Sequence, residues 1–399
     1  MKALVTDASF AHTLDIVRCL GKRGIDVYAM GVPSTRGLDF SFHSRYCKEG
    51  IIGPNPKEDE YVEFLAQTLK SRNIDILIPV GYWSTGKISR NRTKLDPLTH
   101  IEIAKLESFR LAASKKRTYE LANALGVPYP KTVYPRDFDE VREISRNIKY
   151  PAVIKPLNEG CCHPLYPRTP QELLQRYRGM CQKNSLSKDN FPMIQEYIVA
   201  DSTHSFSALY QSGVCKRVFM WNEIRSNPVS GGSSTYSESI YDPKVKEYGL
   251  KLLDALEWHG VANIEFKLDK RDKQFKLMEI NPRFWASVEV ASQSGIDFPY
   301  LLCQMASGVQ LEYSEEYDRN VKFHWLIREI HHAMQKPNAI PRIVADTFDP
   351  RVRSDIHPND FAPHILEFAL LLVELILSPF RARYAVNRNH SKIPRQTLA

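Results

Sequence analysis

Residues Leu277 to Ser287 read LMEINPRFWAS, which places a carboxylate, an amide and a guanidinium at alternate positions of one short segment. Side chains along a β-strand point to opposite faces of the sheet in turn. Glu279, Asn281 and Arg283 therefore share one face, and the apolar residues between them share the other. A strand with one wholly polar face indicates either a binding site or a solvated surface that carries an Arg–Glu pair.

The preceding predicted strand supplies a matching carboxylate. In the segment VANIEFKLD, Glu265 stands between two apolar neighbours, and the polar turn at 269–274 can form a hairpin that sets Glu265 beside Glu279. Two carboxylates and the amide two residues further on would then converge, and these are the oxygen ligands that Mg²⁺ prefers. A bound cation removes the repulsion between the carboxylates, and Arg283 would face a phosphoryl group.

The composition is that of a globular protein. The chain has 399 residues, of which 43% are hydrophobic and 25% charged, so it is long enough for two or three cores. The formal charge of +8 indicates an anionic partner, but the basic residues are spread along the chain. A nucleic-acid-binding module would need basic and aromatic residues clustered on one element. We therefore expect phosphate-bearing small molecules rather than nucleic acid.

Cysteine usage and the first residues indicate the compartment. The seven cysteines include no CxxC spacing, and MKALVTDASF runs into a predicted strand without a cleavable apolar segment. These features predict a protein of the reducing cytoplasm.

The first part of the chain, 1–112, alternates strands and helices as an open α/β unit. Lys2–Asp7 and Asp26–Gly31 are predicted strands that flank a helix, and the turn between the first strand and the helix lacks the glycines of a dinucleotide site. A further strand, Asp75–Gly81, leads into YWSTGKISRNR, which is predicted to be a polar loop. Its polar side chains are interpreted as either ligand-facing or solvated: Ser84, Lys87 and Arg90.

Beyond this unit, the pattern changes to α+β. Residues 113–199 read as a small lobe in which Lys155 ends a buried strand, and 200–310 read as a second lobe of strands and helices. The remaining residues, 311–399, form a C-terminal extension in which the two adjacent histidines at 331 and 332 are interpreted as packing or surface residues.

Five motifs in order resemble the ATP-grasp superfamily, especially its carboxylate-amine or thiol ligase branch related to biotin carboxylase and carbamoyl phosphate synthetase. They are SKKRTYELANALGVPYPKT, YPAVIKP, MIQEYI, GVANIEFK and LMEINPRFW, and they cover about Ser114 to Gly308. The resemblance implies an α/β and α+β fold, with an N-terminal open α/β (pre-ATP-grasp) domain followed by a two-lobed ATP-grasp domain.

The resemblance also implies a role for each matching residue. Lys155 and Lys115 would reach the ATP phosphates, with Lys116 as the alternative to Lys115, and Arg283 would stabilise the transferring phosphoryl group. The backbone of the hinge would contact adenine through Glu196, Tyr197 and Ile198. The Mg²⁺ (or Mn²⁺) ligands would be Glu265, Glu279 and Asn281. Asp201, just after the hinge, is a candidate for the ribose.

The implied reaction is phosphorylation of a small-molecule carboxylate by ATP, followed by attack of an amine, ammonia or thiol on the acylphosphate. Such an intermediate needs a cover against water. Arg225–Ser239, RSNPVSGGSSTYSES, is the candidate cover, with substrate contacts from Arg225, Gly231, Gly232 and Ser233; a mobile surface loop is the alternative. A non-catalytic ATP-binding sensor of the same fold remains open.

Two regions weaken or complicate this interpretation. The loop after Lys155 reads LNEGCCHPLYPRTP and carries one glycine where the family has several. The run Ile365–Leu377 is apolar apart from two glutamates and precedes a basic tail, so that 365–395 is either a peripheral membrane contact or a core or homodimer helix with a disordered tail. We favour the second interpretation of this run.

Overall fold

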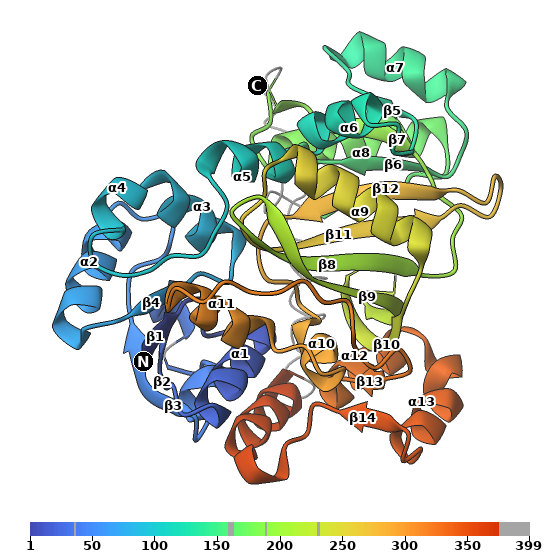
Figure 1. Cartoon of the computed structure of the whole chain (residues 1–399). Helices are drawn as coiled ribbons and strands as arrows, with labels where there is room; N and C mark the ends of the chain where they lie inside the picture. Colours follow the sequence, from blue (N-terminus) through green and yellow to red (C-terminus); the bar gives the residue numbers. More distant parts are fainter. Residues whose placement is uncertain (36, 159–162, 188–189, 230–231, 375–399) are drawn as a thin grey trace, which may run out of the picture.

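The computed structural model describes residues 1–374 apart from 36, 159–162, 188–189 and 230–231 (Figure 1). Its strands form three sheets of four, seven and three strands within the described residues. In Figure 1 the four-stranded sheet lies to the left, the seven-stranded sheet to the right, and the three-stranded sheet above it. The arrangement of an open α/β unit beside α+β lobes confirms the predicted fold class.

The N-terminal sheet is parallel, with strand order β3-β2-β1-β4. Within β1, Ala3 and Val5 pack in one core and Leu4 in another, so the strand is buried on both faces. A parallel sheet covered on both sides is expected to carry such continuous apolar runs. The elements are β1 (Lys2–Val5), α1 (Ala11–Lys22), β2 (Asp26–Gly31), β3 (Cys47–Ile52), α2 (Tyr61–Arg72) and β4 (Ile76–Ile78), with short 3₁₀ turns at η1 (Pro33–Thr35) and η2 (Phe40–His43).

The predicted loop after β4 is helical, so this prediction was wrong. Residues 82–95 form α3 (Tyr82–Arg90) and α4 (Arg92–Leu95). The Gly81 carbonyl accepts hydrogen bonds from Ser84 Oγ at 2.9 Å and Thr85 Oγ1 at 2.7 Å, and Ile88 is fully buried. Hydroxyl groups that appeared to be ligand contacts therefore stabilise the first turn of α3. Lys87 lies 3.8 Å from Asp59.

A small lobe follows two connecting helices, α5 (Leu106–Ala113) and α6 (Lys115–Ala124). Its antiparallel sheet has the order β5-β7-β6 and packs on two helices through Val141, Ile154 and Leu173. Thr169 caps the second helix, because its Oγ1 accepts the Glu172 backbone N–H at 3.2 Å. The elements are β5 (Thr132–Val133), α7 (Phe138–Asn147), β6 (Ala152–Lys155), α8 (Pro170–Lys183) and β7 (Met193–Glu196).

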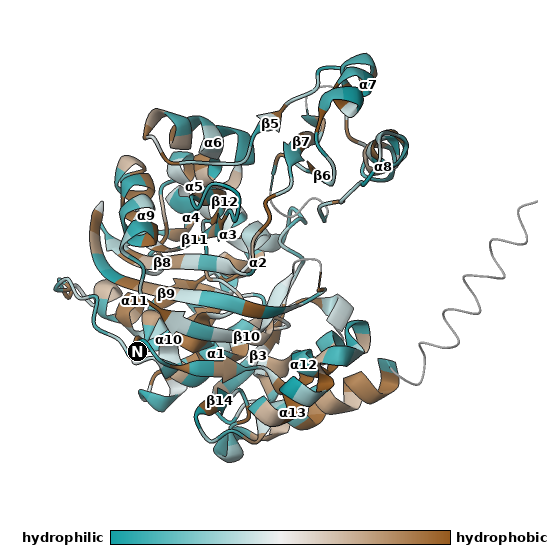
Figure 2. Ribbon diagram, turned by 90° about the vertical axis from the view of Figure 1, so that its right-hand side faces the viewer, coloured by the Kyte–Doolittle hydropathy of each residue, from teal (hydrophilic) through white to brown (hydrophobic). Residues whose placement is uncertain are grey.

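The large sheet has the order β12-β11-β8-β9-β10-β13-β14, and its apolar face packs against α9 (Pro243–Ala255). The helix approaches the sheet closely at Gly249, where a Cβ atom would come within 2.3 Å of Phe206. The strands are β8 (Thr203–Gln211), β9 (Val214–Asn227), β10 (Ser233–Ile240), β11 (Gly260–Leu268), β12 (Phe275–Asn281), β13 (Lys322–His324) and β14 (Val352–Ser354). On the opposite face, Glu265 and Lys267 line a cavity together with residues of the small lobe. Figure 2 shows this lobe, with α7 and α8, above and to the right of the large sheet.

The C-terminal residues complete the large sheet rather than forming a separate extension. Strands β13 and β14 both come from beyond residue 310. The remaining elements are α10 (Val288–Gln293), α11 (Phe298–Ala306), α12 (Leu326–Gln335), η4 (Pro337–Ala339), α13 (Ile340–Thr347), η5 (Pro358–Asp360) and a helix over 362–374. Among the helices of the described residues, none combines the length and apolar character needed to cross a bilayer.

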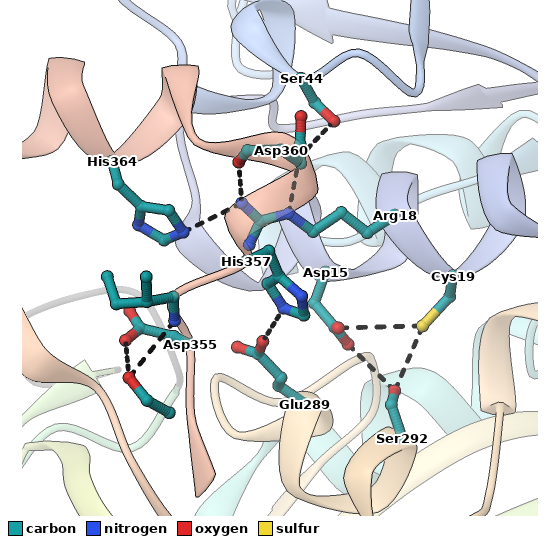
Figure 3. Close-up of polar contacts among 12 residues, drawn as sticks. Asp15, Arg18, Cys19, Ser44, Glu289, Ser292, Asp355, His357, Asp360 and His364 are labelled. Atoms are coloured by element: carbon teal, nitrogen blue, oxygen red, sulfur yellow. Dashed lines mark hydrogen bonds and ion pairs between the residues drawn. The ribbon is translucent and has the colours of Figure 1, made fainter. Parts of the chain in front are cut away.

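A buried ionic cluster joins the beginning of the chain to its end (Figure 3). Arg18 of α1 is 2% exposed and donates to the Asp360 carboxylate at 2.7 Å, to the Asp360 carbonyl at 3.0 Å and to His364 Nε2 at 3.0 Å. Asp15, on the same helix, accepts from Ser292 of α10 at 3.1 Å. Burial, together with the Glu289 carboxylate, raises the pKa of Asp15 to about 7. The packing of α1 against α10 and against the segment 360–364 therefore depends on charged groups that are shielded from water.

Replacing Arg18 by Met should destabilise the protein by about 3–5 kcal/mol, because the carboxylate of Asp360 would stay buried without its cation. Chemical denaturation measures this change. Arg23→Met is the matched control: Arg23 follows the same helix, its side chain is 53% exposed, and we expect a change within about 0.5 kcal/mol. Equal losses for the two variants would contradict the role given to the buried pair.

Replacing Asp15 by Asn should reduce the pH dependence of stability. The pKa of Asp15 rises from 3.8 to about 7 on folding, so folding takes up a proton. Its contribution to stability is thus fully present below about pH 4 and is lost as the pH rises to about 7. Thermal unfolding between pH 5 and 8 should show a smaller fall in Tm for the variant than for the parent protein. The exposed Asp59→Asn control should keep the parental slope.

Candidate active site

The opening motif folds as the sequence predicts. Strands β11 and β12 pair antiparallel, and Glu265 lies directly opposite Glu279. The amide of Asn281 donates from Nδ2 to Glu265 Oε1 at 3.1 Å. Directly opposed residues on one face of a sheet have Cβ atoms within about 5.5 Å of each other. The hairpin therefore brings together two carboxylates that are 14 residues apart in the sequence, and the amide of Asn281 lies beside them.

Cationic side chains reach this group from three other places. Lys115, at the start of α6, lies with Nζ 3.0 Å from Glu279 Oε2. Lys155 ends β6 and is 7% exposed. Arg283 follows β12, and its guanidinium contacts the Phe284 carbonyl at 2.7 Å and Asn281 Oδ1 at 3.4 Å. The small lobe, the connecting helix and the large sheet each supply one positive charge.

The two carboxylates differ in their electrostatic surroundings. Burial and the nearby Glu279 raise the pKa of Glu265. Burial also opposes ionisation of Glu279, but Lys115 and Lys155 outweigh it and lower the pKa of that carboxyl. Burial, with some repulsion from Lys115, lowers the pKa of Lys155 to about 8. A divalent cation beside Glu265 would relieve the repulsion that the protein's own cations leave in place.

These groups line a cleft of about 470 Å³ between the small lobe and the large sheet. The candidate residues that the cleft brings together are Lys115, Lys155, Glu196, Tyr197, Ile198, Gly232, Ser233, Glu265, Glu279 and Arg283. Its volume falls in the range of small-molecule sites, roughly 300–1,000 Å³. The site is therefore assembled from segments more than 150 residues apart.

The hinge between the lobes is held by charged contacts. Glu196 ends β7, and its carboxylate accepts the Lys131 backbone N–H at 2.9 Å and Arg271 at 3.0 Å. The carbonyl of Val199 accepts the Lys270 N–H at 2.9 Å. The Glu196 side chain is thus engaged in contacts within the protein. The candidate ligand contacts of this segment are therefore those of its backbone.

Other candidate residues lie elsewhere. Asn281 is 5% exposed and reaches the site through its contact with Glu265. Asp201 pairs with Lys270 and lies outside the main cleft, in a neighbouring cavity of about 510 Å³ that Tyr197 of the hinge also lines. Gly231 falls outside the described residues.

The expected cover of the site needs correction. Most of Arg225–Ser239 belongs to β9 and β10, and only residues 228–232 connect the strands. Arg225 pairs with Glu329 at 2.6 Å and with Asp346 at 2.8 Å, and its guanidinium lies 4.2 Å from the centre of the Tyr236 ring. It is a structural residue that anchors α12 and α13 to β9, not a group held ready for a substrate carboxylate.

Sequence reasoning missed two residues of the cleft, Glu223 and Lys267. Lys267 stands two positions after Glu265 on β11, so strand alternation alone places both on one face. Glu223 on β9 lies opposite Thr203 on the neighbouring strand β8, and Thr203 lies opposite Lys267 on β11. Burial and the Glu265 charge raise the pKa of Glu223 to about 8. No signal in the β9 sequence distinguishes Glu223 from a solvated residue.

Arg283 also faces residues from outside the predicted site. Burial, together with the charges of Arg283 and Arg328, lowers the pKa of His12 well below its usual value. His12 lies in α1 and Arg328 in α12. The charges of Arg283 and of Arg328 in α12 therefore both act on a buried side chain of α1.

A second group of potential metal ligands lies outside this cleft. One atom each of Asp355, His364 and Glu367 falls within 4.8 Å of the others. However, Arg18 can only donate, so His364 Nε2 must accept and the ring proton resides on Nδ1. Neither nitrogen then offers a free lone pair to a cation. We assign this group to the ionic cluster of Figure 3.

Parts of the chain are similar in sequence to known proteins. Residues 227–329 match the family model described as ATP-grasp in the biosynthetic pathway with Ter operon. The carbamoyl phosphate synthase large chain of Methanoculleus marisnigri is 23% identical over 282 residues, which is 65% of this chain. The match spans 26% of that relative's length.

Several solved structures share the fold. The biotin carboxylase domain of Hydrogenobacter thermophilus 2-oxoglutarate carboxylase, solved with MgADP and bicarbonate, gives a TM-score of 0.63 at 18% identity, covering 80% of this chain and 72% of that one. Biotin carboxylase from Campylobacter jejuni gives 0.64 at 16%, covering 80% and 74%. N5-carboxyaminoimidazole synthetase from Staphylococcus aureus gives 0.62 at 13%, covering 79% of each chain.

Replacing Glu265 by Gln should stabilise the protein in EDTA by about 1–2 kcal/mol, because it removes a buried charge that faces Glu279. The same change should abolish any rise in Tm on adding Mg²⁺ or Mn²⁺. Differential scanning fluorimetry with and without the ions measures both effects. Glu257→Gln, at a carboxylate 79% exposed, is the control and should change neither. A Glu265→Gln variant that is less stable in EDTA would contradict the electrostatic account.

Proposed function

The chain has an ATP-grasp fold, and we propose on this basis that it is an ATP-dependent ligase acting on a small-molecule carboxylate. In this proposal the carboxylate is phosphorylated to an acylphosphate, and an amine, ammonia or thiol then takes the acyl group. The observation that carries the proposal is the convergence of Glu265 and Glu279 with four cationic side chains in one cleft, Lys115, Lys155, Lys267 and Arg283. The relatives are synthetases and carboxylases, so their names support the reaction class and leave the substrates of this chain to experiment.

In this proposal, a nucleotide lies in the cleft with its adenine at the hinge and its phosphates at the lysines. We assign the adenine to the hinge, Glu196 to Ile198, where Ile198 is 4% exposed and offers an apolar contact. The phosphates would then extend toward Lys155 and Lys115, the two lysines that face Glu279. Their charge favours a polyphosphate because each lysine is buried at 7–8% exposure and is poorly hydrated.

The donor set suits a hard divalent cation. Glu265, Glu279 and Asn281 would hold Mg²⁺ (or Mn²⁺), and the ion would offset the burial and the Glu279 charge that raise the pKa of Glu265. When bound, the ion would supply positive charge that offsets the negative charge developing during transfer. Carboxylate and amide oxygens are the ligands that this chemistry requires.

The chain's own residues would then act by position and charge. An oxygen of the substrate carboxylate forms a bond to the γ-phosphorus as the bond to ADP breaks, and Arg283 and Lys155 stabilise the charge on the transferring group. The nucleophile next attacks the acyl carbon, and inorganic phosphate leaves. No covalent enzyme intermediate is needed. Closure of the small lobe on the large sheet would keep water from the acylphosphate.

We place the acid substrate beside Arg283, which lines the cleft. The charges of Arg283 and Arg328 also both act on His12 of α1. The lowered pKa of His12 keeps its imidazole neutral, and one of its nitrogens is buried without a hydrogen-bond partner. A carboxylate bound there would meet two positive charges and a neutral donor.

Replacing Lys155 by Met should lower turnover by about 10²–10³-fold, because the charge stabilising the transferring phosphoryl group would be lost. ADP release with MgATP, pooled carboxylates and pooled amines or thiols measures the rate. Lys105→Met, at a side chain 76% exposed, is the control and should keep the parental rate.

Tight binding of MgATP without ADP release under any substrate combination would favour a non-catalytic sensor of the same fold over the ligase. Absence of nucleotide binding would overturn both. Isothermal titration calorimetry with MgATP separates these two results, and a binding isotherm that depends strongly on salt for oligonucleotides alone would indicate a nucleic-acid-binding protein instead.

A further inference from the structure

The helix over 362–374 is fixed to the protein by its polar side. His364 is 4% exposed and contacts Arg18 at 3.0 Å, and Glu367 lies 3.6 Å from His364. Leu371 is buried, and Glu374 lies 3.4 Å from His331 of α12. His364 and Glu367 therefore face the protein, and Glu374, although 62% exposed, lies on the same side beside His331.

Its opposite side is apolar and exposed. The side chains on this side, with their exposed fractions, are Phe361 (50%), Ile365 (60%), Phe368 (50%), Leu372 (44%) and Val373 (50%). The spacing of four, three and four residues from 361 to 372 aligns them in one stripe along the helix. The exposed positions between them are Ala362 and Ala369. Figure 2 colours this helix, which precedes the grey C-terminal trace, mostly brown.

This polarity is the reverse of that of an ordinary surface helix, which buries its apolar stripe and presents polar residues to water. A contiguous exposed stripe of two phenylalanines and three aliphatic residues marks an interaction surface. We call it the apolar stripe, defined as Phe361, Ile365, Phe368, Leu372 and Val373.

We propose that the apolar stripe docks on an anionic lipid surface. The sequence that follows supplies the matching charge: residues 375–399 contain five basic side chains and no acidic one. These are Arg381, Arg383, Arg388, Lys392 and Arg395. Interfacial helices bind lipid through apolar side chains, and neighbouring basic residues add attraction to anionic headgroups. Stable attachment generally takes two such signals, and this region has both.

A second copy of the chain fits the same surface less well. Five half-exposed side chains present on the order of 500 Å², which is below the roughly 800 Å² per partner of a standard specific interface. Pairing the stripes of two copies would also bring two basic segments together, and their like charges would repel. An anionic lipid surface meets both the apolar stripe and the basic segment.

The geometry indicates a helix that lies along the surface. The thirteen helical residues over 362–374 span roughly 20 Å at about 1.5 Å each. Only one side is apolar, and the other is attached to the protein through His364 and Glu374. The inference is independent of the proposed catalytic function.

Co-sedimentation of the full chain with vesicles tests the proposal. Vesicles of phosphatidylcholine containing about 30% phosphatidylserine should bind the parent protein, and vesicles of phosphatidylcholine alone should bind at least about tenfold more weakly. Raising the salt from about 0.1 to 0.5 M should weaken binding. The triple variant Ile365→Ser, Phe368→Ser, Leu372→Ser should lose at least about tenfold in partitioning, because it removes apolar contacts without adding charge.

The control is Val214→Ser, which changes an apolar residue 57% exposed at the β8–β9 turn and should bind as the parent does. Circular dichroism and Tm should show that the triple variant remains folded. Light scattering at the same concentrations gives the molar mass without lipid. A dimer that the triple variant dissociates, or a monomer that ignores both kinds of vesicle, would overturn the proposal. Equal loss in the Val214→Ser control would do the same.

Discussion

Repulsion between two carboxylates on adjacent strands is the constraint on which the site depends. Antiparallel pairing of β11 and β12 fixes Glu265 opposite Glu279, and the apolar face behind them prevents the strands from slipping. Burial and Glu279 raise the pKa of Glu265 although Lys267 and Lys155 offset part of the effect, whereas Lys115 and Lys155 lower the pKa of Glu279. A cation held by this hairpin, as we propose, would relieve the remaining repulsion. Sites of this kind trade stability for function.

The surrounding fold brings the remaining groups to this pair. Lys155 comes from the small lobe and Lys115 from the helix that connects the N-terminal unit to it, so closure of the cleft and the supply of charge are linked. The charges of Arg283 and of Arg328 in α12 act together on His12 of α1, so residues far apart in the sequence influence one another here. Arg225, through Glu329 and Asp346, holds α12 and α13 against the same sheet. The parts that differ most in sequence position therefore lie around the place where we put the acid substrate.

The sequence allowed prediction of those features that depend on local periodicity. Strand alternation in LMEINPRFW and VANIEFKLD was enough to pair Glu265 with Glu279, and the order of five motifs was enough for the fold. Other features depend on partners far along the chain. Arg225 was interpreted as a substrate contact because its partners lie 104 and 121 residues later. The polar run after β4 looked like a loop for a local reason, because its hydroxyl groups bond to the backbone within one turn. Strands β13 and β14 have three residues each, which is too little pattern to predict that they complete a distant sheet.

The contact of Arg18 with Asp360 has a consequence for biosynthesis. The two residues are separated by 342 positions, and both are almost fully buried. At about 5–20 residues per second, the ribosome would expose a finished first helix for roughly 20–70 s before its partner emerges. During this interval the guanidinium and the apolar surface around it stay in water. The N-terminal unit can then form its sheet, but α1 cannot yet pack against the segment that contains Asp360. A nascent chain halted before residue 360 should therefore hold α1 in a protease-sensitive state, and this is the stage at which a chaperone would find its binding surface.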